Sequence, residues 1–286
     1  MTRCAVLGDP IEHSLSPVLH RAAYAALGLD WTYDAVRVAA GELAAYLGGL
    51  DAEWRGLSLT MPLKRAVVPL LTSQDPWTEM SGGANTVLLD EGGARHGLNT
   101  DVPGAEAALA QATQDHLRTA VVIGGGATAT SVLLALAERG LERATVVVRE
   151  PARAADTVAA VARHPQAPEL TVVPSSGLDQ VTADIVVSTV PAEAQTDALL
   201  DAVLGGEDLH VVFDVVYDPW PTPLAARALA SGGTVVRGLD LLVWQAVDQV
   251  RAMTGRFDVP VEAMRAAGES ALAERAERQR SRPPVP

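Results

Sequence analysis

Up to Asp101, short apolar runs typical of strands alternate with segments whose apolar residues recur at helical spacing. Two of the apolar runs flank the turn sequence Asp90-Glu91-Gly92-Gly93, which predicts a hairpin. This half of the chain is therefore expected to be an α/β unit. Its expected elements are strands at 3–8, 31–38 and 56–60, helices at 16–27, 41–50, around Lys64 and after Asp101, and a hairpin of 84–89 with 94–99.

From Thr119 onward the alternation is more regular, and the apolar runs are nearly continuous Val and Ile. Such runs are typical of parallel strands whose sheet is covered by helices on both faces. Six of them, separated by helical segments, predict a doubly wound domain of the Rossmann type. The six runs are AVVIG, TVVVR, TVVP, ADIVVSTV, HVVFDVV and GTVVRG, and two helices are expected after them, at 241–253 and from Val261.

Charge and hydropathy exclude several classes of protein. The 286 residues contain 22 Lys and Arg against 35 Asp and Glu, a net charge of −13, and this argues against a general nucleic-acid binder. No apolar run approaches the roughly 20 residues that span a bilayer, and the start MTRCAVLGDP lacks the pattern of a signal peptide. We therefore expect a cytoplasmic protein that binds neither nucleic acid nor membranes.

Cysteine and histidine give no sign of a metal centre. Cys4 is the only cysteine, and its place in the apolar run CAVLG predicts a buried strand residue. The six histidines are scattered without the spacing of a zinc site, so no metal is expected.

Lysine and asparagine are unusually scarce. One of the 22 basic residues is a lysine, Lys64, and the other 21 are arginines; Asn85 and Asn99 are the only asparagines. A general bias toward arginine explains most of this composition. The remaining lysine then marks a place where a group that can lose a proton is needed, since arginine effectively cannot.

The strand AVVIG runs directly into a glycine turn and then into a helix. Gly124, Gly126 and Ala129 fit the pattern G-x-G-x-x-G/A, which allows a tight turn, close approach of the backbone to a pyrophosphate, and tight packing of helix on strand. The N–H groups at the start of the helix attract the anion. This predicts a dinucleotide site.

The residues after the second strand of this unit decide which dinucleotide is bound. An acidic side chain there favours NAD, whereas arginines favour the 2′-phosphate of NADP. Arg149 and Arg153 stand on either side of Glu150, so NADP is favoured and NAD stays open. A purely structural alternative is that Glu150 pairs with Arg153 on a solvated face.

Four polar segments of the first half lie near expected strand ends, where α/β sheets bind ligands: residues 14–17, 58–64, 83–86 and 99–101. Each has a local explanation, because Ser16-Pro17 suits a helix start, Lys64 a solvated helix face, and Asn-Thr pairs suit turns. Together they hold the only lysine, both asparagines and the carboxylate of Asp101.

These segments are where the chain resembles the shikimate dehydrogenase family, including its quinate-oxidising branch. The resemblance runs from Ala5 to about Gly268. The motifs that carry it are GDPIEHSLSP, LTMPLK, GANT, NTD, GGGATA, FDVVYDPWPTPL and GLDLLVWQA.

The resemblance implies a reversible, NADP-dependent reduction of 3-dehydroshikimate to shikimate, in the shikimate pathway of aromatic amino acid biosynthesis. It implies that Lys64 and Asp101 are the catalytic pair. An ammonium beside the carbonyl oxygen stabilises the charge that develops there and donates a proton. The implied substrate-binding residues are Ser14 and Ser16 for the carboxylate, and Thr60, Asn85, Asp101 and Gln245 for the ring hydroxyls, with Tyr217 close by.

On the cofactor side, the resemblance implies a pyrophosphate loop, a 2′-phosphate site and a nicotinamide site. The chain departs from the family where Val148-Arg149-Glu150 replaces a common Asn-Arg-Thr, which weakens the case for NADP. The other departures are Thr128, Ser58 and Leu241. The implied residues are Gly124, Gly125, Gly126, Ala127 and Thr128 for the pyrophosphate, Arg149 and Arg153 with the nearby Glu150 for the 2′-phosphate, and Val215 and Gly238 for the nicotinamide.

The expected architecture is a substrate-binding and catalytic domain at 1–102, completed by helices at 239–275, and a dinucleotide-binding domain at 103–238. A cleft between them is expected to close by hinge motion near 102 and 238. The tail at 276–286 is polar and is expected to be disordered. The expected partners are small molecules, and the chain is a monomer or a homodimer. Two alternatives stay open: an NAD-preferring quinate/shikimate dehydrogenase, and a nucleotide-binding module without catalysis.

Overall fold

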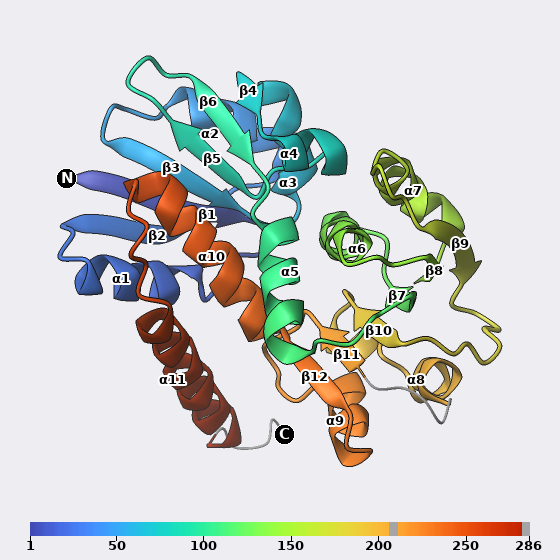
Figure 1. The fold of residues 1–286 in the computed structure, drawn as a ribbon. Coiled ribbons are helices and arrows are strands. Elements are labelled where there is room, and N and C mark those ends of the chain that lie inside the picture. The colour runs from blue at the N-terminus through green and yellow to red at the C-terminus, as the bar shows by residue number, and fades with distance from the viewer. Residues whose placement is uncertain (206–210, 282–286) are drawn as a thin grey trace.

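The computed structural model describes residues 1–205 and 211–281. They form two α/β units, each built on a six-stranded sheet, which lie side by side (Figure 1). The expectation of two α/β units, the second of the Rossmann type, is confirmed.

The sheet of the first unit mixes parallel and antiparallel strands. Its first three strands pair in parallel, and the hairpin that was expected from the turn residues continues the sheet in antiparallel fashion. Cys4 is buried in the second strand of this order, as its apolar neighbours predicted. The strand order is β2 (Trp31–Arg37), β1 (Thr2–Gly8), β3 (Trp54–Leu59), β5 (Thr86–Leu89), β6 (Arg95–Leu98) and β4 (Ser73–Gln74).

One helix of the first unit is clearly shorter than its sequence pattern suggested. The segment expected as one helix at 41–50 is a 3-10 turn followed by a short helix, and the helix that holds Lys64 has four residues. A capped helix after Asp75 was not expected. These elements are α1 (Ser16–Ala26), η1 (Ala40–Glu42), α2 (Leu43–Gly48), α3 (Leu63–Ala66), η2 (Val68–Leu70), α4 (Pro76–Ser81) and α5 (Asp101–Ala112).

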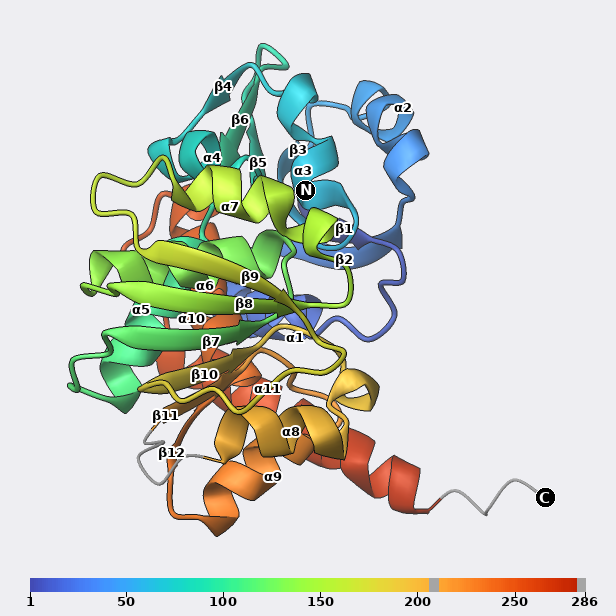
Figure 2. The same ribbon diagram turned by 90° about the vertical axis from the view of Figure 1, so that its right-hand side faces the viewer.

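The second sheet is parallel throughout, and its order is that of a doubly wound dinucleotide-binding fold (Figure 2). Alternate residues of one strand face opposite cores: Val122 packs with the helix that follows the glycine turn, and Val121 packs on the other side. The order is β12 (Thr234–Arg237), β11 (Val211–Asp214), β10 (Ile185–Ser188), β7 (Thr119–Ile123), β8 (Arg143–Val148) and β9 (Glu169–Pro174).

Helices cover both faces of this sheet, which is why its strands are rich in Val and Ile. Leu133 packs against one face, and Leu199 and Leu224 pack against the other. The helices at 197–204 and 223–230 were not expected individually. The helical elements are α6 (Ala127–Glu138), η3 (Pro151–Ala154), α7 (Ala155–Val161), η4 (Ala192–Ala194), α8 (Asp197–Leu204) and α9 (Pro223–Ala230).

The last two helices, α10 (Gly238–Thr254) and α11 (Val261–Arg280), return to the first unit. Val243 and Val247 of α10 share a core with Leu15 and Leu19, and α10 lies against α5 between the two sheets (Figure 1). No helix in the described part of the chain combines the length and the apolar character needed to cross a bilayer.

The expectation of disorder from residue 276 was wrong for its first part, because α11 continues to Arg280. The segment ALAERAERQR is rich in strong helix formers, and Glu274 pairs with Arg278 one turn later at 3.5 Å. Residues 282–286 lie outside the described part of the chain.

Candidate active site

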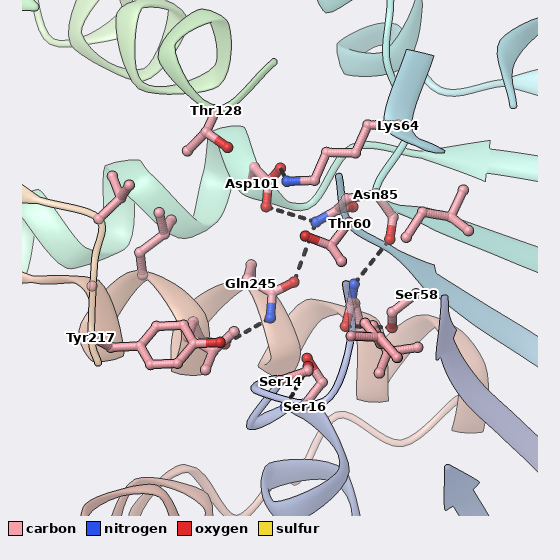
Figure 3. A pocket seen from close by; sticks show the side chains of 18 of the residues that line it. Ser14, Ser16, Ser58, Thr60, Lys64, Asn85, Asp101, Thr128, Tyr217 and Gln245 are labelled. Carbon is pink, nitrogen blue, oxygen red and sulfur yellow. Dashed lines mark hydrogen bonds and ion pairs between the residues drawn. The ribbon is translucent and has the colours of Figure 1, made fainter. Parts of the chain in front are cut away.

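A cavity of about 260 Å³ lies between the two units. Its lining includes side chains from the ends of β1 and β3, from α5 and α10, and from the start of α6 (Figure 3). Eleven of the sequence-predicted site residues line it: Ser14, Ser16, Thr60, Lys64, Asn85, Asp101, Thr128, Val215, Tyr217, Gly238 and Gln245.

Lys64 and Asp101 meet at one end of this cavity. Lys64 follows β3 on the short helix α3, and Asp101 is the first residue of α5. The Lys64 Nζ donates to Asp101 Oδ2 at 2.5 Å, and the two side chains are only 15% and 8% exposed. Two oppositely charged groups, 37 residues apart in the chain, are thus held together beside an open space.

Asn85 fixes the other oxygen of the carboxylate. Its Nδ2 donates to Asp101 Oδ1 at 2.9 Å and to Gln245 Oε1 at 3.2 Å. Its Oδ1 accepts from the backbone N–H of Thr100 at 2.9 Å. With Lys64 on one oxygen and Asn85 on the other, Asp101 has a defined orientation, and Gln245 of α10 joins the same network (Figure 3).

Asn99 has a different position from Asn85, although both are followed by threonine. Its Oδ1 accepts from the backbone N–H groups of Asp101 at 3.0 Å and Val102 at 3.3 Å, at the start of α5. Its Nδ2 donates to the Gly83 carbonyl at 2.9 Å. Asn99 therefore supports the backbone that carries Asp101 and does not line the cavity.

The two serines lie at the opposite end of the cavity from Lys64 (Figure 3). The N-cap residue of α1 is Leu15, which makes no side-chain capping hydrogen bond, so Ser16 is the first helical residue. The backbone N–H of Ser16 donates to Ser14 Oγ at 3.2 Å. A helix start with two hydroxyls beside it suits an anion such as a carboxylate.

Tyr217 reaches the same end from the loop after β11. Its hydroxyl donates to the His13 carbonyl at 3.4 Å. Partial burial raises the pKa of the Tyr217 hydroxyl above its ordinary value, so the group stays protonated and can act as a donor.

The glycine turn after β7 has the conformation that its sequence predicted. Gly124 has a φ of +113°, which side-chain-bearing residues rarely adopt. A side chain at Gly126 would meet nothing within 4 Å, so the backbone there borders open space. Gly126 is the N-cap of α6, and no described side chain caps that helix, which leaves its first N–H groups available to a phosphate.

Gly125, Ala127 and Thr128 complete this turn, and Val215 and Gly238 line the same cavity as Thr128. Thr128 lines the cavity and therefore connects the turn with the Lys64 end. A side chain at Gly238 would overlap the backbone of Val215, so the close packing of α10 on the β11 loop requires glycine.

Arg149, Glu150 and Arg153 follow β8 outside the cavity. Arg153 Nε lies 3.7 Å from Glu150 Oε2, and their side chains are 62% and 73% exposed. The ion pair between Glu150 and Arg153, which was expected as a purely structural alternative, is therefore present. It does not exclude a phosphate site, because both groups are free to move in solvent.

Two residues of the cavity, Ser58 and Gln249, were not predicted as site residues. The Ser58 hydroxyl donates to Gln249 Oε1 at 2.8 Å and accepts from Tyr33 at 2.5 Å. The Gln249 amide donates to Thr86 Oγ1 at 3.0 Å. A signal was available, because Gln249 follows Gln245 at helical spacing on an otherwise apolar face of α10.

Comparisons with known proteins identify the family of the chain. The model of the shikimate dehydrogenase substrate binding domain matches residues 6–87, and the model of the shikimate 5′-dehydrogenase C-terminal domain matches residues 238–267. A shikimate dehydrogenase (NADP(+)) of Methanosarcina barkeri is 37% identical over 270 residues, which cover 91% of this chain and 95% of that protein.

Two solved structures have the same fold along nearly the whole chain. The shikimate dehydrogenase of Mycobacterium tuberculosis is 38% identical, with a TM-score of 0.81 over 94% of this chain and 100% of that one. The shikimate 5-dehydrogenase of Thermus thermophilus, solved with NADP(H) and shikimate, is 32% identical, with a TM-score of 0.79 over 95% and 100%.

Proposed function

Because the chain belongs to the shikimate dehydrogenase family, we propose that it catalyses the reversible reduction of 3-dehydroshikimate to shikimate with NADP as cofactor. The observation that carries the proposal is the Lys64–Asp101 pair, held at 2.5 Å on a cavity that extends from the glycine turn to the two serines. A proton donor, a dinucleotide turn and an anion site are the three parts that such a reduction needs.

The residues of the second unit fit a dinucleotide. The uncapped start of α6 and the open backbone at Gly126 suit its pyrophosphate, and Arg149 and Arg153 suit a 2′-phosphate. Val215, Gly238 and Thr128 border the cavity where a nicotinamide would reach the substrate. When bound, the reduced cofactor supplies a hydride to the carbonyl carbon.

Lys64 handles the proton in this proposal. As the carbonyl oxygen gains negative charge, the Lys64 ammonium stabilises it and donates a proton, and in the reverse direction neutral Lys64 accepts the proton of the alcohol. Asp101 orients the ammonium through its 2.5 Å contact. An arginine at position 64 would stabilise the charge but could hardly release the proton.

The polar groups of the first unit would orient the substrate. Ser14 and Ser16 hold its carboxylate at the start of α1, while Thr60, Asn85, Asp101 and Gln245 bind its hydroxyls. Because Asn85 bridges Asp101 and Gln245, the hydroxyl-binding groups form one connected network. This separation of a carboxylate end from a hydroxyl end fixes which ring carbon faces the cofactor.

One observation favours a second candidate, an NAD-preferring quinate/shikimate dehydrogenase. The Glu150 carboxylate lies 3.7 Å from Arg153 and competes with a phosphate for that arginine. The same carboxylate could accept hydrogen bonds from the ribose of NAD. The Lys64–Asp101 pair would serve either alcohol.

The test is a steady-state assay of the purified protein with shikimate or quinate and with NADP or NAD. We expect the highest kcat/KM with shikimate and NADP. An NAD preference above about tenfold, which corresponds to one charged contact, would favour the second candidate. Cofactor binding without any substrate-dependent turnover would instead indicate a nucleotide-binding module.

We also propose that the protein binds only small molecules, that it is located in the cytoplasm, and that it is a monomer or a homodimer. Fractionation of the producing cells and light scattering of the purified protein would test the location and the oligomeric state.

A further inference from the structure

Two loops from different units border the serine end of the cavity. The first, residues 9–15, connects β1 with α1 and carries Ser14; the second, residues 215–222, connects β11 with α9 and carries Tyr217. Each loop contributes lining residues. Their separation therefore sets the width of the cavity at the end where a carboxylate is proposed to bind.

A single side chain of the C-terminal helix contacts both loops. Arg275 Nη1 donates to the His13 carbonyl at 2.9 Å and to Asp218 Oδ2 at 3.2 Å. The Tyr217 hydroxyl donates to the same His13 carbonyl at 3.4 Å. One carbonyl, next to Ser14 in the chain, thus receives hydrogen bonds from α11 and from the β11 loop.

This bridge is not an exposed surface pair. The side chains of Arg275 and Asp218 are 20% and 16% exposed, whereas Arg278 and Glu274, on the same helix, are 67% and 63% exposed. A partly desolvated guanidinium with two fixed acceptors is held in place far better than a solvated one. Arg275 also lies beyond residue 267, where the match to the family's C-terminal domain ends.

We propose that Arg275 is a positioning residue that sets the carboxylate site by holding the Ser14 loop and the Tyr217 loop at a fixed separation. The neighbouring Asp218 neutralises its charge, so it acts through the placement of the two loops and not by direct attraction of the substrate. Because the loops belong to different units, the same bridge limits how far the units separate at this end of the cleft. The inference rests on the proposed function, because it assigns the substrate carboxylate to Ser14 and Ser16.

The test compares Arg275→Ala with the matched control Arg278→Ala in the full-length protein. With Arg275→Ala we expect the KM for shikimate to rise about tenfold, the value of one charge-assisted hydrogen bond, while kcat and the KM for NADP change by less than about threefold. Arg278→Ala should match the wild type. Arg275→Lys should recover part of the loss, because one ammonium reaches only one of the two loops well.

Two further measurements distinguish a specific role of Arg275 in positioning the two loops from a general loss of local structure in the variant. The methyl ester of shikimate has no carboxylate charge, so Arg275→Ala should change its KM by less than about twofold. Titration calorimetry with shikimate should show the same tenfold loss of affinity without any turnover. If Arg275→Ala does not fold, Asp218→Asn replaces it, with a smaller increase in the KM for shikimate expected because the His13 contact survives.

The outcomes distinguish the two proposals. An unchanged KM and affinity for shikimate in Arg275→Ala, or an equal loss with the ester, would overturn the role of Arg275 while the proposed function stands. A wild-type protein that neither binds nor oxidises shikimate would overturn the proposed function, and with it the assignment of this loop pair to a carboxylate.

Discussion

The Lys64 end of the cavity and the Arg149–Arg153 end of the dinucleotide site differ in how firmly their polar side chains are held. At the first end, Asp101 is bound on both carboxylate oxygens, and its side chain is 8% exposed. At the second, Arg153 and Glu150 meet at 3.7 Å with more than half of each side chain in solvent.

This difference indicates whether the fold or a bound ligand fixes the positions of the polar side chains at each end. The buried network is ordered by the fold before any ligand arrives, which is what transition-state stabilisation requires. The exposed arginines are not fixed by the fold; if they bind the cofactor as proposed, the ligand orders them, and they contribute to affinity and cofactor choice. Substitutions at the first end should therefore change kcat, and substitutions at the second should change the KM for the cofactor.

The largest effect is expected for Lys64→Ala. Loss of a positioned proton donor should lower kcat by roughly 10²- to 10⁴-fold while the KM for shikimate changes little. Lys64→Arg should be nearly as slow, since it keeps the charge but not the transferable proton. Steady-state rates would show this, with Arg251→Ala at an exposed pair as the control. Near-normal turnover of Lys64→Ala would contradict the proposed catalytic role of Lys64.

The next effect is expected for Asp101→Asn, which keeps the shape but removes the charge that orients Lys64. We expect kcat to fall about 10²-fold, because the ammonium loses its fixed direction. The control is Asp30→Asn, an exposed carboxylate in the same unit. Rates equal to the wild type would show that the 2.5 Å contact is structural only.

Stability should also depend on pH through His20, a buried residue of α1 that lies outside the cavity lining. Its Nδ1 donates to the Ser16 carbonyl at 2.9 Å and its ring stacks on Tyr33 at 3.9 Å, while Nε2 has no partner among the described residues. Burial lowers the pKa of His20 from 6.5 to about 4. The unfolded chain therefore binds more protons between these values, and stability falls as the pH drops through that window.

From pH 7 to pH 5, His20 should cost the wild type about 2 kcal/mol of unfolding free energy. His20→Phe keeps the stack on Tyr33 and should lose less stability over the same range. Urea unfolding at the two pH values measures this, with His116→Phe at an exposed position as the control. A parallel pH dependence of wild type and His20→Phe would contradict the assignment.

The smallest effect is expected at the exposed end. Glu150→Gln removes the partner of Arg153 and should raise kcat/KM with NADP about threefold, the value of a solvated ion pair, without changing kcat. Arg153→Ala should have the opposite effect. Glu193→Gln, another exposed carboxylate of the second unit, is the control. A change in kcat of Glu150→Gln would contradict the expectation that substitutions at the exposed end affect only the KM for the cofactor.

Much of the fold was accessible from the sequence because it depends on local patterns. The Val and Ile runs of the second unit predicted its six strands, since a parallel sheet covered on both faces admits little else. The short elements β4 and α4 were missed, and the segment expected as one helix at 41–50 is a 3-10 turn followed by the short helix α2. Helices of four to six residues take most of their stability from packing, so their boundaries are weakly encoded in local sequence.

The scarcity of lysine and asparagine in the sequence drew attention to Lys64 and Asn85, and the resemblance to the family implied the role of Asp101. The sequence could not show that Asn85 binds Asp101 while Asn99 supports the backbone of α5, as both precede a threonine. It also gave no reason to connect Gln249 with Ser58, or Arg275 with His13.

The sequence by itself therefore determined the α/β class, the dinucleotide turn and the chemical groups available to the reaction. The tertiary structure decided which of these groups meet, which are buried, and which stay in solvent. The physical reason is that period and turn chemistry act over a few residues, whereas contacts such as Lys64 with Asp101 depend on how two strand ends and a helix start are brought together.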